Sequence, residues 1–284
     1  MLSYQHGFHA GNFADLHKHL SLALLLESLN RKSKPWSYLE THSGRGLYDL
    51  RDAQAEKTGE YLQGIAKLWS NHSDDGLGRY IDLIRALNPS GNLETYPGSP
   101  QIAANMARAD DSIHLMELHP QEVAALKRNF RGYEGVAVHH RDGYEGVLAH
   151  LPPKPNRGLV LIDPAYEVKD EYAQVASFVV KALKKWGNAS IAIWYPVLSA
   201  QRHEQMINSV VMGCPEPSIL RSEMHIAAPA ERGMFGSGML LINPPWQIDQ
   251  QLSELVPQLL GHLLKDQGRT QQGSVRLEWL REPQ

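Results

Sequence analysis

Apolar and polar positions follow two periods along the chain, one typical of helices and one typical of strands. The first helical pattern comprises Leu16, Leu20, Leu24 and Leu25. Asn12, with Asp15 three residues later, resembles the capping pair that begins a helix. The pattern therefore predicts a helix from about residue 14 to 30, which ends at the polar run NRKSKP.

A short strand and then a long helical region follow this helix. The segment WSYLETHSGRG, residues 36–46, predicts a buried strand that enters a glycine-containing turn. From 47 to 95 the strand pattern is missing, and apolar residues recur at helical spacings. We expect an N-terminal segment with a helix and the first core strand at 1–46, an inserted helical subdomain at 47–95 and the remainder of the core at 96–284.

Strand and helix patterns alternate after the insert. Ser99 as a cap and Pro100 as a first-turn proline predict a helix start. Strands are then predicted at 112–119, 136–142, 158–166 and 190–197, each followed by a helix, which is typical of a parallel sheet with helices on both faces. The last two strand patterns, SILRSEMHIA and GSGMLLINPP, have no helix between them and predict an antiparallel hairpin. This α/β arrangement resembles the Rossmann-like, seven-stranded methyltransferase sheet.

Two strand ends carry nearly the same motif, LIDPAYE at 161–167 and LLINPPW at 240–246. Both resemble the acid-or-amide, proline, aromatic signature of enzymes that methylate exocyclic amino groups. In an open α/β sheet the ligand crevice lies beyond the carboxyl ends of the parallel strands, where strand order reverses. Asp163 ends a strand that flanks this point, whereas Asn243 ends an antiparallel strand. We therefore assign the chemistry to the first motif and interpret 243–246 as a structural turn with a packed Trp246.

The residue types of the first motif suit attack by an amino nitrogen. The lone pair of adenine N6 is delocalised into the ring, so an acceptor for an N6 hydrogen helps the nitrogen to attack a methyl group. The Asp163 carboxylate and the Pro164 carbonyl could both accept, and Tyr166 would stack on a base that has been turned out of its helix. The alternative is a plain Asp-Pro turn.

Polar residues at the ends of other predicted strands complete a candidate cofactor site. Glu117 ends the second strand, where an acidic residue can bind ribose hydroxyls, unless it is simply an exposed carboxylate. Asp142 with Gly143 ends the third strand and can reach an adenine amino group, unless Asp142 is only a helix cap. The turn after the first strand lacks the full G-x-G-x-x-G fingerprint, which counts against a dehydrogenase.

Histidines near the N-terminus raise the question of a metal site. His17 and His19 lie two apart on a predicted helix and so point to different faces, and neither H-E-x-x-H nor paired-cysteine spacing occurs. We therefore expect no metal. Lys18, His19 and His42 are better explained as polar side chains over a cofactor carboxylate, or as solvated helix and turn residues.

Charge and composition add limits on partners and compartment. A formal net charge of −3 gives no global attraction to nucleic acid, so RNA binding would require a local basic patch. The one cysteine, Cys214, excludes an internal disulfide framework and fits a reducing compartment, and we expect it to be buried. Neither a secretory signal pattern nor an apolar run of membrane length is found. We therefore expect a cytoplasmic protein without membrane contact.

Segments along essentially the whole chain are similar to one enzyme family. They are MLSYQHGFHAGNFADLHKH, LETHSGRG, YPGSP, MELHP, RDGYE, LIDPAYE, IWYPV and INPPW. In this order they closely resemble the ribosomal RNA large-subunit adenine N6-methyltransferases of the RlmJ type. The resemblance implies S-adenosylmethionine as methyl donor and N6 of adenine 2030 in 23S ribosomal RNA as target. It also implies a Rossmann-like core with a helical insert, usually in a monomer.

The resemblance also implies roles for single residues. Cofactor contacts fall on Lys18, His19, His42, Ser99, Glu117, Asp142, Gly143 and Asp163. Asp163 is in addition the catalytic acceptor, and Tyr4 falls on an N-terminal aromatic that engages substrate. The family normally has Asp-Pro-Pro-Tyr, so Ala165 departs from its motif. This departure concerns the rigidity of the loop, and hence the rate, more than the type of reaction.

Two other functions stay open on the sequence alone. The short motif would also suit a methyltransferase that acts on DNA adenine or on protein glutamine. A non-catalytic nucleic-acid-binding protein with the same fold, for instance one that serves DNA uptake, is favoured only by Ala165. The intact acidic and aromatic residues of the candidate site favour an enzyme.

Overall fold

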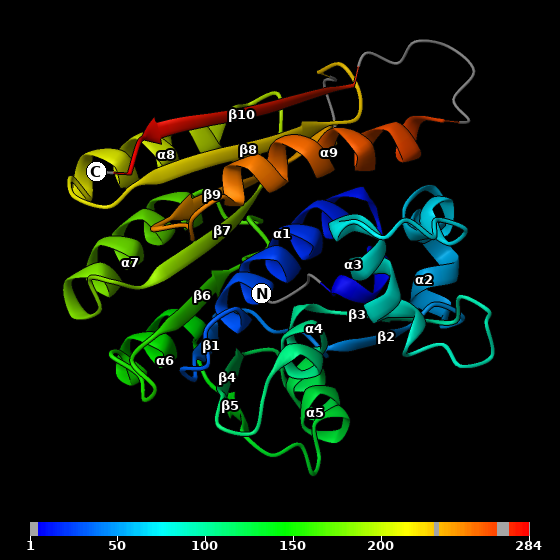
Figure 1. Ribbon diagram of the computed structural model, residues 1–284, viewed down its shortest axis with the longest axis horizontal. Helices are drawn as coiled ribbons and strands as arrows, with labels where there is room; N and C mark the ends of the chain where they lie inside the picture. Colours follow the sequence, from blue (N-terminus) through cyan, green and yellow to red (C-terminus); the bar gives the residue numbers. More distant parts are fainter. Residues whose placement is uncertain (1–4, 230–232, 266–272, 284) are drawn as a thin grey trace.

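A mixed sheet of eight strands runs through the centre of the molecule (Figure 1). The computed structural model describes residues 5–229, 233–265 and 273–283. The strands of the sheet are β1 (Ser37–Glu40), β4 (Ser112–Glu117), β5 (Val136–His140), β6 (Gly158–Ile162), β7 (Ser190–Val197), β8 (Ile219–His225), β9 (Gly236–Ile242) and β10 (Ser274–Arg281). Their order across the sheet is β10-β8-β9-β7-β6-β1-β4-β5.

The parallel core and the hairpin are confirmed, but the predicted number of strands is wrong. Strands β5, β4, β1, β6 and β7 are parallel, and β9 pairs antiparallel with both β7 and β8. The sheet has eight strands rather than seven, because β10 pairs antiparallel with β8 and adds an outer edge. Arg276 and Glu278 alternate with apolar residues in β10, and such charges are common on edge strands. The fold is the Rossmann-like methyltransferase fold with this one addition.

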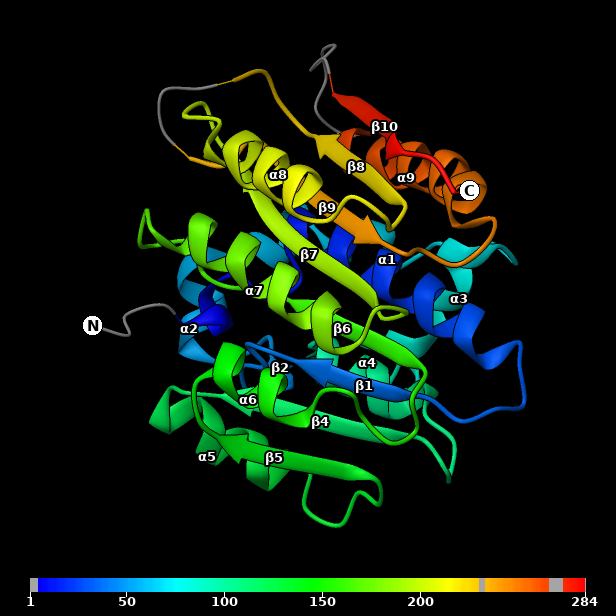
Figure 2. The same ribbon diagram turned by 90° about the vertical axis from the view of Figure 1, so that its left-hand side faces the viewer.

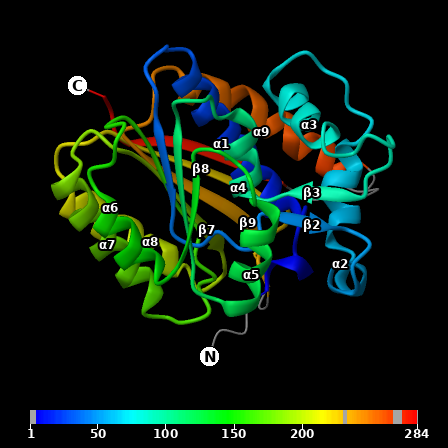
Figure 3. The same cartoon turned by 90° about the horizontal axis from the view of Figure 1, so that it is seen from below.

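Helices cover both faces of the sheet, as Figure 3 shows from below. One face carries α6 (Gly143–His150), α7 (Glu171–Lys185) and α8 (Arg202–Gly213). The other carries α1 (Phe13–Asn30), α4 (Ser99–Met106), α5 (Pro120–Asn129) and α9 (Ile248–Leu264). Successive residues of a strand point to opposite faces, so the central strand β1 sends Tyr38 into one apolar core and Leu39 into the other. The central strands are thus buried on both sides, as parallel sheets require.

The first helix forms where the apolar spacing predicts it. The Asn12 side chain caps α1 by accepting hydrogen bonds from the backbone N–H groups of Ala14 and Asp15, both at 3.0 Å. Helix α1 contacts β9, α4 and α9, and most of its residues are buried. The two central histidines do point to different faces, because His17 bonds Ser222 and Ser237 whereas His19 lies against Tyr96.

The region from 47 to 95 contains both short helices and a small sheet. Its elements are β2 (Leu47–Asp49), α2 (Ala53–Thr58), the 3-10 turns η2 (Glu60–Gln63) and η3 (Ile65–Leu68), α3 (Gly76–Arg85) and β3 (Thr95–Pro97). A further 3-10 turn, η1 (His6–Phe8), precedes α1. Strands β2 and β3 pair antiparallel and join the two ends of the insert, a feature that helical periodicity did not predict. Helix α3 contacts α1 and α9, so the insert lies beside the N-terminal helix (Figure 1).

Two local predictions need correction. Trp246 is 80% exposed rather than packed. The turn itself lies where β7 begins, opposite the carboxyl end of β6, and the Asn243 amide donates to the carbonyls of Gly187 and Ala189. The cap of α4 is Gly98 rather than Ser99, because the Ser99 hydroxyl donates instead to Glu40. The burial of Cys214 is confirmed. Among the described residues, no helix is long and apolar enough to span a bilayer.

A buried ion cluster ties the antiparallel edge together. The Arg221 side chain is 2% exposed and contacts the carboxylates of Glu204 and Glu223, the latter at 2.6 Å. Tyr195 donates a hydrogen bond to the same Glu223 oxygen at 3.0 Å. Burial raises the pKa of Glu223, but His225 and the Arg221 charge lower it by more, to about 2. Glu223 is therefore ionised in the folded protein at any ordinary pH.

We expect the Glu223→Gln substitution to reduce stability by about 3 kcal/mol at pH 7, from the pKa difference between folded and unfolded states. A lowered folded pKa contributes stability fully above the ordinary value of 4.5, and that contribution is lost as the pH falls towards 2. Urea unfolding at pH 7 and pH 3 should therefore show a smaller difference from wild type at pH 3. The exposed Glu216→Gln is the control and should match wild type at both pH values.

Candidate active site

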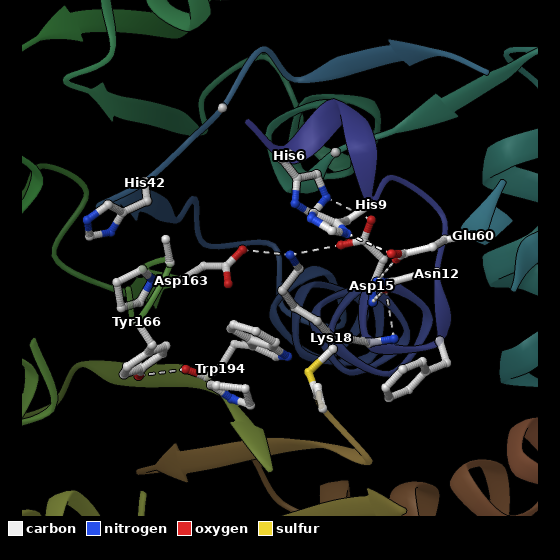
Figure 4. Close-up of a pocket in the computed structure, with 18 of the residues that line it drawn as sticks. His6, His9, Asn12, Asp15, Lys18, His42, Glu60, Asp163, Tyr166 and Trp194 are labelled. Carbon is white, nitrogen blue, oxygen red and sulfur yellow. Dashed lines mark hydrogen bonds and ion pairs between the residues drawn. The ribbon is translucent and has the colours of Figure 1, made fainter. Parts of the chain in front are cut away.

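A cavity of about 890 Å³ lies at the carboxyl ends of β1, β4 and β6 (Figure 4). Segments far apart in sequence line it: the N-terminal turn and α1, the turn after β1, the end of β4, the loop after β6, and part of the insert. Strand order reverses between β1 and β6, so the cavity sits where an α/β sheet places its ligand. The position predicted from the strand pattern is thus the position of this cavity.

A lysine joins two carboxylates in the middle of this cavity. The Lys18 ammonium lies 2.6 Å from Asp163 Oδ2 and 3.0 Å from Asp15 Oδ1, as the dashed lines of Figure 4 show. All three side chains are largely buried, with 5% of Lys18, 1% of Asp15 and 14% of Asp163 exposed. Burial raises the pKa of Asp15, but His6 and Lys18 act against this rise, and the pKa stays well below its usual range. The lysine therefore lies between two negative charges, and the interpretation of Lys18 as a solvated residue is wrong.

The chain ahead of α1 folds back over this cavity. Gly11, with a φ of +76°, makes the reversal, and its N–H donates to Asp15 Oδ2 at 2.9 Å. The reversal places His6 Nε2 2.8 Å from the same Asp15 oxygen. Glu60 of the insert fixes the segment from the other side through His9 and Asn12, both at 2.9 Å. The N-terminal segment and the insert therefore close one wall of the site together.

The loop after β6 brings the acidic motif into the cavity. Asp163, Pro164 and Tyr166 all line it. Tyr166 has a φ of +53°, which is unusual for a side chain of this size. Its hydroxyl donates to the Trp194 carbonyl at 2.8 Å, and its ring centroid lies 4.4 Å from that of Tyr172. These contacts fix the tyrosine ring at the cavity wall.

Glu117 lies at the end of β4 and also lines the cavity. Its side chain is buried, so the alternative of an exposed carboxylate is wrong. One oxygen accepts the Gly44 N–H at 2.8 Å and the other accepts the His119 N–H at 2.6 Å. Burial raises the pKa of this carboxyl, although these hydrogen bonds act against the rise. The two bonds hold the carboxyl at the strand end, where ribose hydroxyls are expected.

Two residues that line the cavity each have a buried polar atom without a hydrogen bond among the described residues, His19 Nε2 and Ser43 Oγ. The nearest carboxylate oxygen to His19 Nε2 in an ion pair is Asp15 Oδ1 at 3.8 Å, beyond hydrogen-bond distance. His19 Nδ1 is already bonded to the Tyr96 hydroxyl at 2.9 Å. Burial lowers the pKa of His19 well below its ordinary value, so the ring is neutral. Buried polar atoms normally have partners, so these two fit a cavity that receives a polar ligand.

Of the remaining residues predicted to contact the cofactor, some line the cavity and some do not. His42 and Ser99 line the cavity, but Asp142 and Gly143 do not. Burial lowers the pKa of His42 to about 4 in spite of the nearby Asp163 and Asp142 charges. Asp142 caps α6 by accepting the Glu145 N–H at 2.9 Å, which is the alternative that the sequence left open. Tyr4 lies outside the described residues.

The sequence did not assign His6, Asp15, Ser43 or Trp194 to this site, although all of them line it. The first two meet only because of the reversal at Gly11, and a glycine followed by a helix cap was the available signal. Ser43 lies in the glycine-containing turn that was predicted after the first strand. Trp194 lies on β7 and receives the Lys18 ammonium 5.8 Å from its ring, a cation–π distance.

Gly143 has a packing role that a substitution can test. A Cβ at this position would lie 1.9 Å from the Thr41 carbonyl oxygen of the backbone after β1. We therefore expect Gly143→Ala to push the start of α6 from the sheet and to lower stability by about 1–3 kcal/mol, the usual cost of overpacking. Chemical denaturation measures this loss. Gly261→Ala on α9 is the control, since its Cβ would meet no atom within 4 Å, and an unchanged Gly143→Ala would contradict the close approach.

Comparisons with known proteins identify the family of the chain. The family model described as "Ribosomal RNA large subunit methyltransferase D, RlmJ" matches residues 33–281. The chain is 43% identical to ribosomal RNA large subunit methyltransferase J of Escherichia coli strain K12, over 93% of this chain and 95% of that protein. It is 42% identical to the Haemophilus influenzae protein of the same name, over 99% of each.

A solved structure gives the same result at the level of the fold. The crystal structure of a Legionella pneumophila protein superimposes with a TM-score of 0.86 and 36% identity, over 95% of this chain and 98% of that one. The superposition therefore covers nearly the whole chain and not a shared core alone. The chain belongs to the RlmJ family of ribosomal RNA large-subunit methyltransferases.

Proposed function

We propose that this protein transfers a methyl group from S-adenosylmethionine to N6 of an adenine in 23S ribosomal RNA, and that the adenine is nucleotide 2030. Family membership supports ribosomal RNA methylation. The observation that carries the choice of an amino nitrogen is the Asp-Pro-Ala-Tyr loop, with its carboxylate inside the cavity. The nucleotide number rests on the family resemblance.

Asp163 and Pro164 act as acceptors for the hydrogens of the amino group. Lys18 contacts Asp163 Oδ2, which leaves Oδ1 for the substrate. An accepted hydrogen bond favours a tetrahedral nitrogen and the positive charge that develops on it, so the gain is electrostatic and positional. Tyr166 supplies a fixed aromatic face for the flipped base. The product ammonium is acidic and loses its proton afterwards, so Asp163 need not be a strong base.

The residues proposed to bind S-adenosylmethionine hold different parts of that molecule. Glu117 suits the ribose hydroxyls, and His19 Nε2 and the Ser43 hydroxyl, which form no hydrogen bond among the described residues, suit polar groups of the amino-acid portion. Asp142 and Gly143 stand at the start of α6 next to His42, on the side expected for the adenine ring. S-adenosylmethionine, when bound, supplies an electrophilic methyl group on a sulfonium, and the transfer requires no metal.

The oligomeric state and the compartment belong to the same proposal. The family resemblance implies a monomeric enzyme. An enzyme that modifies ribosomal RNA works where ribosomes are made, so we place it in the cytoplasm.

The proposal is tested by mass spectrometry of 23S RNA from cells with and without the gene. We expect one N6-methyladenine to disappear in its absence, and wild type but not Asp163→Ala to restore it. The position of the missing methyl group decides between nucleotide 2030 and another adenine.

Tritiated-methyl incorporation into ribosomal RNA, DNA and protein compares the rival acceptors with the purified enzyme. Methylation of DNA or protein, with an unchanged RNA modification map, would contradict the proposed substrate. Failure to bind S-adenosylmethionine by calorimetry would contradict the enzyme altogether and favour a purely nucleic-acid-binding role.

A further inference from the structure

Three histidines from three elements meet on the face of the sheet that α6 covers. His114 lies on β4, His139 on β5 and His150 at the end of α6, and these elements stand together in Figure 2. One ring nitrogen from each lies within 4.8 Å of the other two. All three residues are partly buried, and none lines the candidate active site. Helix α6 begins near the cavity at Gly143, so His150 is at its far end.

One pair of these rings has the spacing of two ligands around one ion. His114 Nδ1 and His139 Nε2 are 3.4 Å apart. Two nitrogens bound to tetrahedral Zn²⁺ at its usual bond length lie about 3.4 Å from each other. The His150 ring centroid lies 4.8 Å from that of His114 and 4.7 Å from that of His139, so the third ring closes the group.

The hydrogen bonds of the outer nitrogens orient two of these rings. His150 Nδ1 lies 2.8 Å from the Gly146 carbonyl oxygen, which can only accept, so Nδ1 carries the proton and Nε2 keeps a lone pair. His114 Nε2 lies 3.1 Å from the Ser112 hydroxyl, which can accept its proton and leave a lone pair on Nδ1, within hydrogen-bond distance of His139 Nε2 at 3.4 Å. A metal-bound histidine usually donates its other N–H to a carbonyl or similar acceptor. The cluster thus has both the inner spacing and the outer bonds of a metal site.

The charge state of the cluster is compatible with binding a cation. Burial and the neighbouring His150 and His139 lower the pKa of His114 to about 4, so its ring is neutral at pH 7. Lys127 and Arg141 lie near His139, and their charges act in the same direction on its pKa. The charges of Lys127 and Arg141 repel a metal ion. Binding of the ion therefore depends on its bonds to the three imidazole nitrogens rather than on electrostatic attraction from neighbouring residues.

We propose that His114, His139 and His150 bind one Zn²⁺ ion, with a fourth position open to water. Three neutral imidazoles suit Zn²⁺ and neighbouring divalent ions such as Ni²⁺ and Cu²⁺, and they do not suit Mg²⁺ or Ca²⁺. The ion would join β4, β5 and the end of α6 at the edge of the sheet. This inference concerns a different face from the candidate active site and does not rest on the proposed methyl transfer.

A second group of similar residues does not support such a site. His203, Glu204 and Glu223 also bring three possible ligand atoms within 4.8 Å of one another. The Arg221 guanidinium already contacts both carboxylates there. Its charge occupies the position that a metal ion would need, so we confine the proposal to the three histidines.

The test uses the untagged full-length protein and ZnCl₂. Calorimetry, with metal analysis after dialysis, should give one ion per chain. His139→Gln and His150→Gln should each lower the affinity at least about tenfold, since even an outer partner of a metal ligand changes affinity by 10- to 100-fold. His140→Gln is the matched control, because this exposed residue follows His139 on β5 and contacts the Leu118 carbonyl instead. It should bind Zn²⁺ as wild type does.

Thermal unfolding provides a second readout that does not depend on calorimetry. The unfolding midpoint of wild type and of His140→Gln should rise with added Zn²⁺, because an ion that binds only the folded state stabilises it. The midpoints of His139→Gln and His150→Gln should not rise, while their midpoints without metal show that both variants fold. Absence of Zn²⁺ binding by wild type, or equal binding by wild type and both variants, would overturn the proposal.

Discussion

The Asp163→Ala protein should lose methyl transfer almost completely and keep its fold. We expect kcat to fall at least about 100- to 1,000-fold, the usual cost of removing one group that stabilises charge in a transition state. Alanine removes both carboxylate oxygens, and with them the acceptor and the negative charge next to the nitrogen that becomes positive. Lys18 retains Asp15 at 3.0 Å, so the buried ammonium is not left alone. Single-turnover methylation of a 23S RNA fragment measures the effect directly.

The control for this substitution is Asp170→Ala. Asp170 is an exposed acid seven residues along the same loop, and its side chain forms no cap bond to α7. We expect wild-type turnover from it, and we expect both variants to bind S-adenosylmethionine within a few-fold of wild type. Retained turnover in Asp163→Ala would exclude Asp163 as the acceptor. A large loss of cofactor affinity would instead assign this carboxylate to binding.

The parallel core could be predicted from sequence because its signal is local. Each strand of the core is a short apolar run, and the helix that follows has its own period, so β4 to β8 were located within a few residues. Strand β10 and the pair β2 and β3 lack that signal. The charges of β10 interrupt its apolar pattern, and each strand of the pair has only three residues, which periodicity cannot detect.

Site residues at the ends of parallel strands could be predicted from the sequence. Contacts that depend on a reversal of the chain could not. Glu117 and Asp163 follow from the rule that parallel strands present their carboxyl ends to one crevice. The contact between His6 and Asp15 depends on the backbone at Gly11, and no spacing rule relates the two. Trp246 shows the reverse error, since an aromatic beside two prolines indicates packing but is exposed.

The buried Lys18 contacts one residue from each of these two parts of the site. Asp163 belongs to the strand-end motif and Asp15 belongs to the reversed N-terminal segment, and Lys18 contacts both. One cation that faces two carboxylates fixes the position of each relative to the other. The catalytic loop and the N-terminal wall of the cavity are therefore coupled through a single side chain (Figure 4).

Replacing that side chain should affect stability and catalysis together. We expect Lys18→Met to lower the free energy of unfolding by about 3 kcal/mol at pH 7, because the loss of one partner leaves buried carboxylates without compensation. Turnover should fall about 100-fold, since Asp163 loses the bond that positions it. Asp15 is held well below its ordinary pKa of 3.8 by a set of charges that includes Lys18. The stability deficit should therefore shrink as the pH falls below about 4, where the carboxyls can protonate.

A double-mutant cycle separates the two effects of Lys18→Met. The double variant Lys18→Met with Asp15→Asn removes the opposite charge as well, so it should be more stable than the sum of the two single losses predicts. It should not recover turnover, because the bond to Asp163 is still missing. Additive losses of stability would show that Lys18 and Asp15 do not interact in solution. Recovery of turnover in the double variant would show that the reversed segment, rather than the orientation of Asp163, limits the reaction.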